Sequence, residues 1–164
     1  MAQAQAEALP MERTVRLERL IDAPRELVWK AWTDPAMLAR WWGPRHFTNP
    51  VCKLSLKVGG ALLIVMRAPD GQEHPMTGTI REIDPPRLLR WTNEARNSDG
   101  DVLLEGGMTV TLEEEGGKTR LSIESFAVGV APPAGFMLQG MEMGWTQSID
   151  RLAELVEDNK GETA

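Results

Sequence analysis

The chain has 164 residues and a formal net charge of −6, and it contains one Cys, two His, six Trp and no Tyr. This length predicts one domain with a single hydrophobic core. A single Cys excludes a disulfide framework within the chain, and the acidic balance, with a pI near 5.0, argues against a nucleic-acid-binding protein.

The two ends of the chain carry no targeting or anchoring signal. The first eleven residues lack a basic start and an apolar run, which excludes a signal peptide and a membrane span there. The longest uninterrupted apolar run is ALLIVM at 61–66, which has the length of a strand. We therefore expect disordered tails at 1–11 and 158–164, one domain over 12–157, no membrane span and a cytoplasmic location.

The first elements are a strand and two short helices. Residues 13–21 alternate in polarity, which predicts a half-buried strand with Arg19 on its apolar face. Asp22 and the following Pro predict the start of a helix that ends before Pro35. Asp34 then predicts the start of a second short helix that runs through Arg40 and is broken by the sequence WWGP.

A run of strands follows, and one long helix closes the chain. Alternation places Cys52, Leu54, Leu56 and Val58 on one face of a strand that starts near residue 50. Further strands are predicted at 61–68, 73–83, 88–93 and 102–112, with a last one around 121–123, and a helix at about 134–157. This order predicts an α+β domain in which a bent antiparallel sheet holds the terminal helix.

Gly140 and Gly144 lie one turn apart beside the apolar stripe of the predicted terminal helix. Glycine within a helix is about 1 kcal/mol less favourable than alanine, so a close approach is expected there. Two interpretations are open, namely tight packing on the sheet or a thinned helix wall beside an internal cavity.

Arg19 is the unusual residue of the first strand, because an inward-facing Arg is unfavourable unless it is paired. It either reaches solvent or pairs with an acid such as Glu82 or Glu105, or it anchors a polar group of a ligand. Glu82 has the same parity as Met76, Gly78 and Ile80, which are expected to face inward. If both residues face inward, an Arg19–Glu82 pair would be the polar end of an otherwise apolar pocket.

Large apolar side chains gather on the faces that are predicted to enclose the terminal helix. An indole ring is apolar apart from its one N–H donor, so it suits an apolar surface that has a single hydrogen-bonding group. Met adds flexible lining. Core filling and cavity lining are both open interpretations, since the same surface serves both in such a fold. With Arg19 and Glu82, the candidate ligand-binding residues are Trp42, Met66, Met76, Trp91, Met108, Met141 and Trp145.

No catalytic or metal-binding pattern stands out. His46, Cys52 and His74 are the soft ligands of the chain, and their spacing matches no metal motif. Cys52 is predicted to be a buried, inert thiol on the apolar face of its strand. His46 follows the WWGP segment and lies either near a pocket mouth or in a surface loop. We expect no metal, no cofactor and no catalytic residue.

Five segments in order resemble a known family: IDAPRELVWKAWTDPAMLARWWGP at 21–44, KVGGALLIVM at 57–66, GTIREIDPPRLLRWTN at 78–93, the stretch from Val110 through GGKTRLSI to Ile123, and GWTQSIDRLAELV at 144–156. The chain resembles the activator-of-heat-shock-protein-90 ATPase homology (AHSA-like) family of the SRPBCC or START-like superfamily. The resemblance implies a helix-grip fold of about seven strands around the C-terminal helix, with a cavity between them. The departures are Lys57, where family members often carry Arg, and Ala61-Leu62, where an aromatic often stands.

The resemblance and the residues together lead to three hypotheses. The first is the binding of a small hydrophobic or aromatic molecule, such as a lipid, in the cavity. The second is a cyclase-like or hydrolase-like enzyme that uses Arg19, Glu82 or His46. The third is a protein-interaction module, or a homodimer, formed through Phe136, Met137 and the loop 127–136. The family's namesake co-chaperone has a separate N-terminal domain, which this chain is too short to hold, so chaperone activation is not expected.

Overall fold

The computed structural model describes residues 11–159, which form one sheet and four helices in that range. The elements are β1 (Glu12–Ile21), α2 (Arg25–Thr33), α3 (Pro35–Trp41), β2 (Thr48–Leu54), β3 (Ala61–Arg67), β4 (Glu73–Asp84), β5 (Leu88–Arg96), β6 (Val102–Glu115), β7 (Lys118–Gly129), α4 (Ala134–Gln139) and α5 (Met141–Asn159). Of the tails predicted at 1–11 and 158–164, residues 1–10 and 160–164 lie outside the described residues. Met11 is described, and Asp158 and Asn159 still belong to α5.

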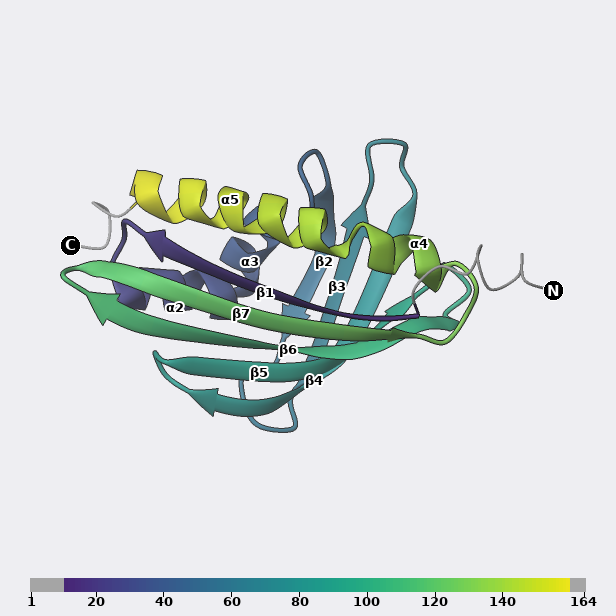
Figure 1. Cartoon of the computed structure of the whole chain (residues 1–164), viewed down its shortest axis with the longest axis horizontal. Coiled ribbons are helices and arrows are strands. Elements are labelled where there is room, and N and C mark those ends of the chain that lie inside the picture. The colour runs from purple at the N-terminus through teal and green to yellow at the C-terminus, as the bar shows by residue number, and fades with distance from the viewer. Residues whose placement is uncertain (1–10, 160–164) are drawn as a thin grey trace, which may run out of the picture.

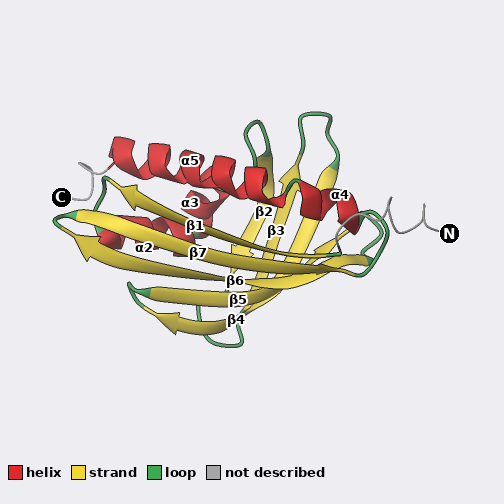
Figure 2. Cartoon of the chain, in the orientation of Figure 1, coloured by secondary structure: helices red, strands yellow, loops and turns green. Residues whose placement is uncertain are grey.

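The sheet confirms the predicted α+β helix-grip fold. Its seven strands run in the order β1-β7-β6-β5-β4-β3-β2, and every neighbouring pair is antiparallel. Figure 1 shows the sheet curving around α5, with α2 and α3 at one end and α4 at the other. Figure 2 shows that strands make up most of the structure and that the helices gather on one side of it. The apolar faces of the sheet and of α5 therefore bury each other.

Local capping explains where the two short helices begin. The Asp34 carboxylate accepts a hydrogen bond of 2.9 Å from the Ala36 N–H, with Pro35 in the first turn of α3, as predicted. The first of these helices, α2, begins at Arg25 with Pro24 in the N-cap position, so Asp22 does not cap it. The Asp22 N–H instead donates to the Glu157 carboxylate near the end of α5.

Two boundaries differ from the predicted pattern. The strand β2 ends at Leu54, and Leu56 and Val58 are exposed, because the 55–60 segment forms a turn in which the Gly60 N–H bonds the Lys57 carbonyl. The predicted terminal helix is two helices, which meet at Gly140. The alternation of residue types predicted the first of these incorrectly, because a turn can carry the same alternation as a strand.

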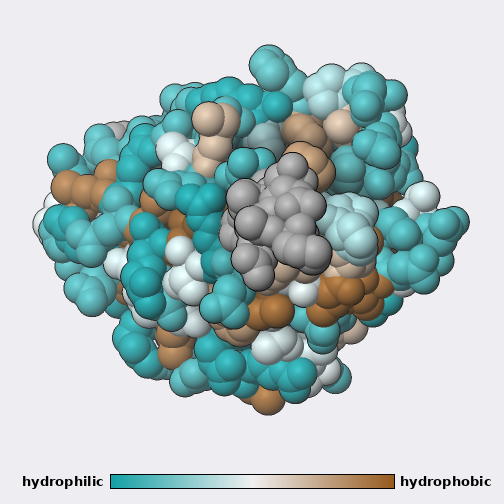
Figure 3. Space-filling view, turned by 45° about the vertical axis from the view of Figure 1, so that its right-hand side comes forward, coloured by the Kyte–Doolittle hydropathy of each residue, from teal (hydrophilic) through white to brown (hydrophobic). Residues whose placement is uncertain are grey.

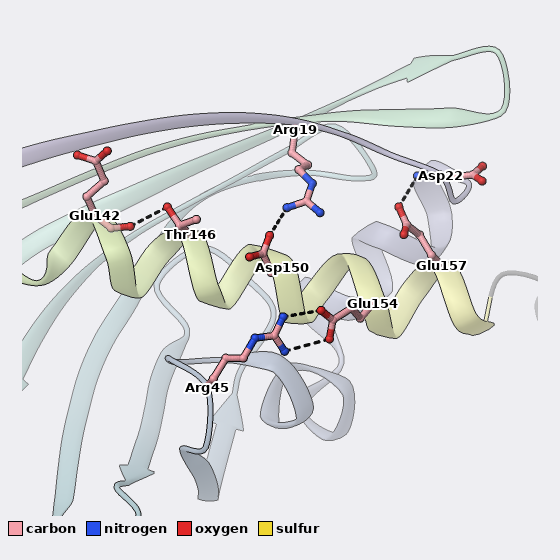
Figure 4. A network of polar contacts seen from close by, with 8 residues as sticks. All are labelled: Arg19, Asp22, Arg45, Glu142, Thr146, Asp150, Glu154 and Glu157. Carbon is pink, nitrogen blue, oxygen red and sulfur yellow. Dashed lines mark hydrogen bonds and ion pairs between the residues drawn. The ribbon is translucent and has the colours of Figure 1, made fainter.

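Ion pairs and hydrogen bonds tie α5 to the rest of the domain (Figure 4). Arg19 on β1 pairs with Asp150, and Arg45 pairs with Glu154. Arg13 donates to the last carbonyl groups of α4 and also pairs with Glu142 at 3.0 Å. All of these groups are partly exposed, so each one adds little to stability. Their combined effect is to fix the position of α5 across the sheet.

A cluster of tryptophans forms the centre of the core. Trp32 is fully buried, and its ring lies 4.6 Å from that of Trp41 and 6.2 Å from that of Trp91, measured between centroids. Trp42 and Trp145 stand at 6.5 and 6.3 Å from the same ring. The α2 helix thus carries the indole around which α3, β5 and α5 pack.

No helix within residues 11–159 is both long enough and apolar enough to cross a membrane.

Candidate ligand-binding cavity

A cavity of about 240 Å³ lies between the inner face of the sheet and the α4–α5 segment. Its wall is mostly apolar and comes from the α3–β2 turn, strands β3 to β7 and both C-terminal helices. Seven of the nine candidate ligand-binding residues line it, namely Trp42, Met66, Met76, Trp91, Met108, Met141 and Trp145. The inward parity of the strands and the stripe of the helix bring these residues together from distant parts of the chain.

Small residues on neighbouring strands make the hollow. Gly78, Asn93, Gly106 and Ala127 stand side by side across β4, β5, β6 and β7. The next row toward the core is Ile80, Trp91, Met108 and Ser125, which is far bulkier. At Gly106 an added Cβ would lie 2.0 Å from the Phe126 carbonyl oxygen, so no larger residue fits there. The step in side-chain size between the two rows leaves the space that the cavity occupies.

Three indoles form the core side of the wall. The Trp42 ring lies 5.8 Å from that of Trp91 and 5.3 Å from that of Trp145. The first pair is tilted and the second is edge-on, and both avoid the less favourable face-to-face stacking. A planar apolar ligand in the cavity therefore meets preformed aromatic surface on this side.

The turn between α3 and β2 closes the cavity near α5. Gly43 has a φ of +91°, a conformation that side chains rarely adopt, and an added Cβ there would lie 2.8 Å from the Met66 sulfur. Gly144 faces the same turn, with Pro44 Cγ 3.9 Å from where its Cβ would be. An added Cβ at Gly140 would also meet nothing closer than 3.9 Å. Neither Gly140 nor Gly144 is therefore tightly packed, and Gly144 lines the cavity.

Arg151 holds this turn in place from α5. Its guanidinium donates to the carbonyl oxygens of Trp42 at 3.1 Å, Gly43 at 2.9 Å and Pro44 at 2.9 Å, and also to that of Arg40 at 3.1 Å. Burial lowers the pKa of this side chain, and the nearby Arg45 lowers it further. Sequence patterning did not single out Arg151, because a helix surface Arg looks like an ordinary solvated charge.

The predicted Arg19–Glu82 pair does not exist. Arg19 has the inward parity that was predicted, but it pairs with Asp150 of α5 and does not line the cavity. Glu82 is exposed and lies 3.4 Å from Arg90 on the outer face. A β-bulge between Ile80 and Glu82 shifts the register, so the parity that holds up to Ile80 is reversed beyond it.

The polar side chains at the wall are ones that sequence patterning missed. Asn93 and His74 line the cavity from β5 and β4, and Ser125 and Ser148 line it from β7 and α5. Ser125 and Ser148 are 7% and 5% exposed. Within residues 11–159, none of the four side chains forms a hydrogen bond to another group of the protein. His46, which was considered for the mouth, is exposed and does not line the cavity.

The proposed interaction loop divides into two parts. Phe136 is 71% exposed, whereas Met137 turns into the cavity. Val128 and Val130 of the same segment are also exposed. Figure 3, in which the end of the molecule with α4 comes forward, shows hydrophobic patches within a mostly hydrophilic surface. A role of this loop in protein binding or homodimer formation stays a prediction.

Cys52 is half-buried on β2, opposite Ile64, and burial raises the pKa of its thiol from 9.0 to about 11. At pH 8 the reactive thiolate is therefore about a hundredfold scarcer than at a pKa of 9.0. We expect slow alkylation by iodoacetamide at pH 8, measured by mass spectrometry, with the urea-unfolded chain as the fast-reacting control. Native and unfolded chains that react at similar rates would contradict this.

Because the pKa of the Cys52 thiol is higher in the folded chain than in the unfolded one, the thiol's contribution to stability is complete below pH 9 and falls as the pH rises toward 11.

Comparison with known proteins places the chain in a family. The family model described as "Activator of Hsp90 ATPase homolog 1-like protein" (AHSA1) matches residues 22–157. The chain belongs to this AHSA1 family. The matched range contains every residue that lines the cavity. None of the curated proteins compared with the chain matches it.

Solved structures agree with the AHSA1 assignment. A protein from Chromobacterium violaceum has 33% sequence identity and a TM-score of 0.71, over 88% of this chain and 96% of that one. A protein from Nitrosomonas europaea has 25% identity and a TM-score of 0.73, over 90% and 96%. The AHSA1 protein from Silicibacter pomeroyi, at 24% identity and a TM-score of 0.70 over 88% and 98%, shares the fold.

Proposed function

We propose that this AHSA1-family protein binds a small apolar or aromatic molecule in the cavity between the sheet and the α4–α5 segment. The observation that carries the proposal is the cavity itself, about 240 Å³ in volume and walled by Trp and Met. A cavity of roughly 150 Å³ lined by aliphatic and aromatic groups holds one benzene ring. The larger volume here suits a ligand with two fused rings or a compact aliphatic molecule of similar size.

The composition of the wall supports binding rather than acid–base catalysis. His74 and Arg96 are the titratable residues among the described ones that line the cavity. The Arg96 guanidinium is engaged by Thr77 and by the Gly100 carbonyl. General acid–base chemistry needs two suitably placed groups within reach of one substrate. A single His at the wall favours a carrier, sensor or sequestering protein over a cyclase or hydrolase.

The variant Ala127→Phe tests whether the ligand binds in the cavity, and Val128→Phe at the next residue is its control. Ala127 lines the cavity, and a phenyl ring at this position takes up the space that a ligand needs. Val128, the next residue, is exposed on the opposite face of β7, so Val128→Phe changes the same strand without entering the cavity. We expect wild type and Val128→Phe to bind naphthalene in equilibrium dialysis, and Ala127→Phe to bind it at least about tenfold more weakly.

Two binding results would contradict the proposal. If naphthalene does not bind wild type, or binds Ala127→Phe as tightly as Val128→Phe, the ligand does not occupy this cavity. Circular dichroism spectra of the three proteins show whether each one is folded before the comparison is made.

A further inference from the structure

The one permanent charge at the described part of the cavity wall is already engaged by other groups of the protein. Arg96 is the one permanently charged residue among the described lining residues, and its Nε donates to the Thr77 hydroxyl at 2.9 Å. Thr77 pairs with Glu94 across the outer face of the sheet, and Glu94 lies 3.6 Å from the Arg96 guanidinium. The guanidinium is therefore satisfied outside the cavity. Burying a ligand carboxylate or ammonium without a partner is strongly unfavourable.

Neutral polar side chains are present instead. Asn93 on β5 and Ser125 on β7 face the cavity, and neither side chain forms a hydrogen bond within the described range. Ser148 contributes a third free hydroxyl from α5. The polar atoms of these three side chains are not among the buried, unpartnered atoms of the described residues, so they are open to the cavity. A ligand in the cavity that carries its own hydrogen-bonding group can therefore bond to them.

Asn93 has the most accessible position of the three. Its cross-strand neighbours on both sides are Gly78 and Gly106, which have no side chains to cover it. Trp91, two residues before it on the same face, also lines the cavity, so the amide stands next to aromatic surface. Ser125 lies two strands away, about 10 Å at the usual spacing between strands, and contacts a different part of a ligand.

We infer that the cavity selects neutral ligands that carry a hydrogen-bonding oxygen, with Asn93 as the specificity-determining contact and Ser125 as a second one. The amide donates its N–H or accepts through its oxygen, so a hydroxyl or carbonyl group on an apolar ring system is the chemistry that it fits. This inference rests on the proposed function and adds the class of ligand to it. Neither Asn93 nor Ser125 is among the candidate ligand-binding residues predicted from the sequence.

Three probes of matched shape test the inference, namely naphthalene, 2-naphthol and 2-naphthoate, each measured by equilibrium dialysis at pH 7. We expect wild type to bind 2-naphthol about three- to tenfold more tightly than naphthalene, the usual net gain from one or two neutral hydrogen bonds. Charged 2-naphthoate should bind at least about tenfold more weakly than 2-naphthol, because its carboxylate finds no cationic partner.

The Asn93→Leu variant keeps the branching of the side chain at Cγ and removes the amide. Its preference for 2-naphthol over naphthalene should fall to about twofold or less, while naphthalene binds as in wild type or more tightly. Ser125→Ala is a second, milder variant that should reduce the same ratio in part. Ser122→Ala is the matched control, because Ser122 lies on the same strand outside the cavity and should keep the wild-type ratio.

The binding results distinguish a failure of the proposed function from a failure of the inferred selectivity. If wild type binds none of the three probes, the proposed function fails and the inference falls with it. If naphthalene binds but 2-naphthol has no advantage, or if 2-naphthoate binds best, the inference alone is overturned. An unchanged ratio in Asn93→Leu and Ser125→Ala also overturns it, since the selectivity then comes from other groups.

Discussion

Replacing Trp32 by Ala is expected to lower the free energy of unfolding by about 3–5 kcal/mol, the usual cost of removing a buried aromatic side chain. Trp32 is 0% exposed, and its ring contacts those of Trp41, Trp42, Trp91 and Trp145. Removing it leaves a hole at the point where two helices, the sheet and α5 meet. The change is measured by urea unfolding followed by circular dichroism.

Two related variants show whether packing is the cause. The Trp32 indole N–H is buried without a hydrogen-bond partner in the described structure, so Trp32→Phe removes an unsatisfied donor and keeps an aromatic ring. It should lose clearly less stability than Trp32→Ala. Trp29→Ala removes a partly buried indole at the edge of the core and should also be milder. A Trp32→Ala protein within about 1 kcal/mol of wild type would contradict the central role of this side chain.

Replacing Arg151 by Met is the second change with a large expected effect. Its guanidinium donates to four backbone carbonyl groups of the 40–44 segment, and Met keeps the length of the side chain without the donors. We expect a loss of about 1.5–3 kcal/mol in the free energy of unfolding, the value of hydrogen bonds from a charged group. Ligand affinity should fall as well, because Trp42, Gly43 and Pro44 of that segment line the cavity.

The neighbouring Arg45 provides the control for Arg151. Arg45 pairs with Glu154 of α5, and both side chains are largely exposed, so Arg45→Met should change stability far less. Denaturation curves and naphthalene binding are compared for the two variants. Equal effects of Arg45→Met and Arg151→Met would show that charge near α5, rather than the fixation of the turn, is what matters.

The order of elements could be predicted from the sequence because alternation and helical spacing are local signals. The same reasoning places six inward Trp and Met residues at the cavity, because their parity in a strand or in the helix stripe decides the face that they occupy; these are Met66, Met76, Trp91, Met108, Met141 and Trp145. This reasoning works as long as the register of a strand is continuous.

The failures have specific physical causes. Glu82 was placed inward because a bulge after Ile80 leaves no trace in the alternation. The partner of Arg19 was missed because Asp150 lies on α5, 131 residues away, and only packing of the helix on the sheet brings them together. Helical spacing alone predicts one continuous helix through Gly140, since a single glycine is compatible with a continuous helix or with a break.

Asn93 was missed for a different reason. It shares the inward parity of Trp91, so the signal was present in the strand that the sequence predicts for 88–93. It stood at the predicted end of that strand, however, where Asn is an ordinary turn residue. The strand continues to Arg96, and the glycines that pair with Asn93 on both flanking strands have no side chains, so they leave Asn93 open to the cavity. Only the pairing of the strands makes that visible.

A crystal structure of the protein soaked with 6-bromo-2-naphthol tests the central claim most directly. The account predicts an anomalous bromine peak inside the cavity, with the ring system against Trp42, Trp91 and Trp145 and the hydroxyl within hydrogen-bond distance of Asn93. A cavity that stays free of the compound while the bromine peak lies on the outer surface would contradict the account, because the space between the sheet and α5 would then not be a ligand site.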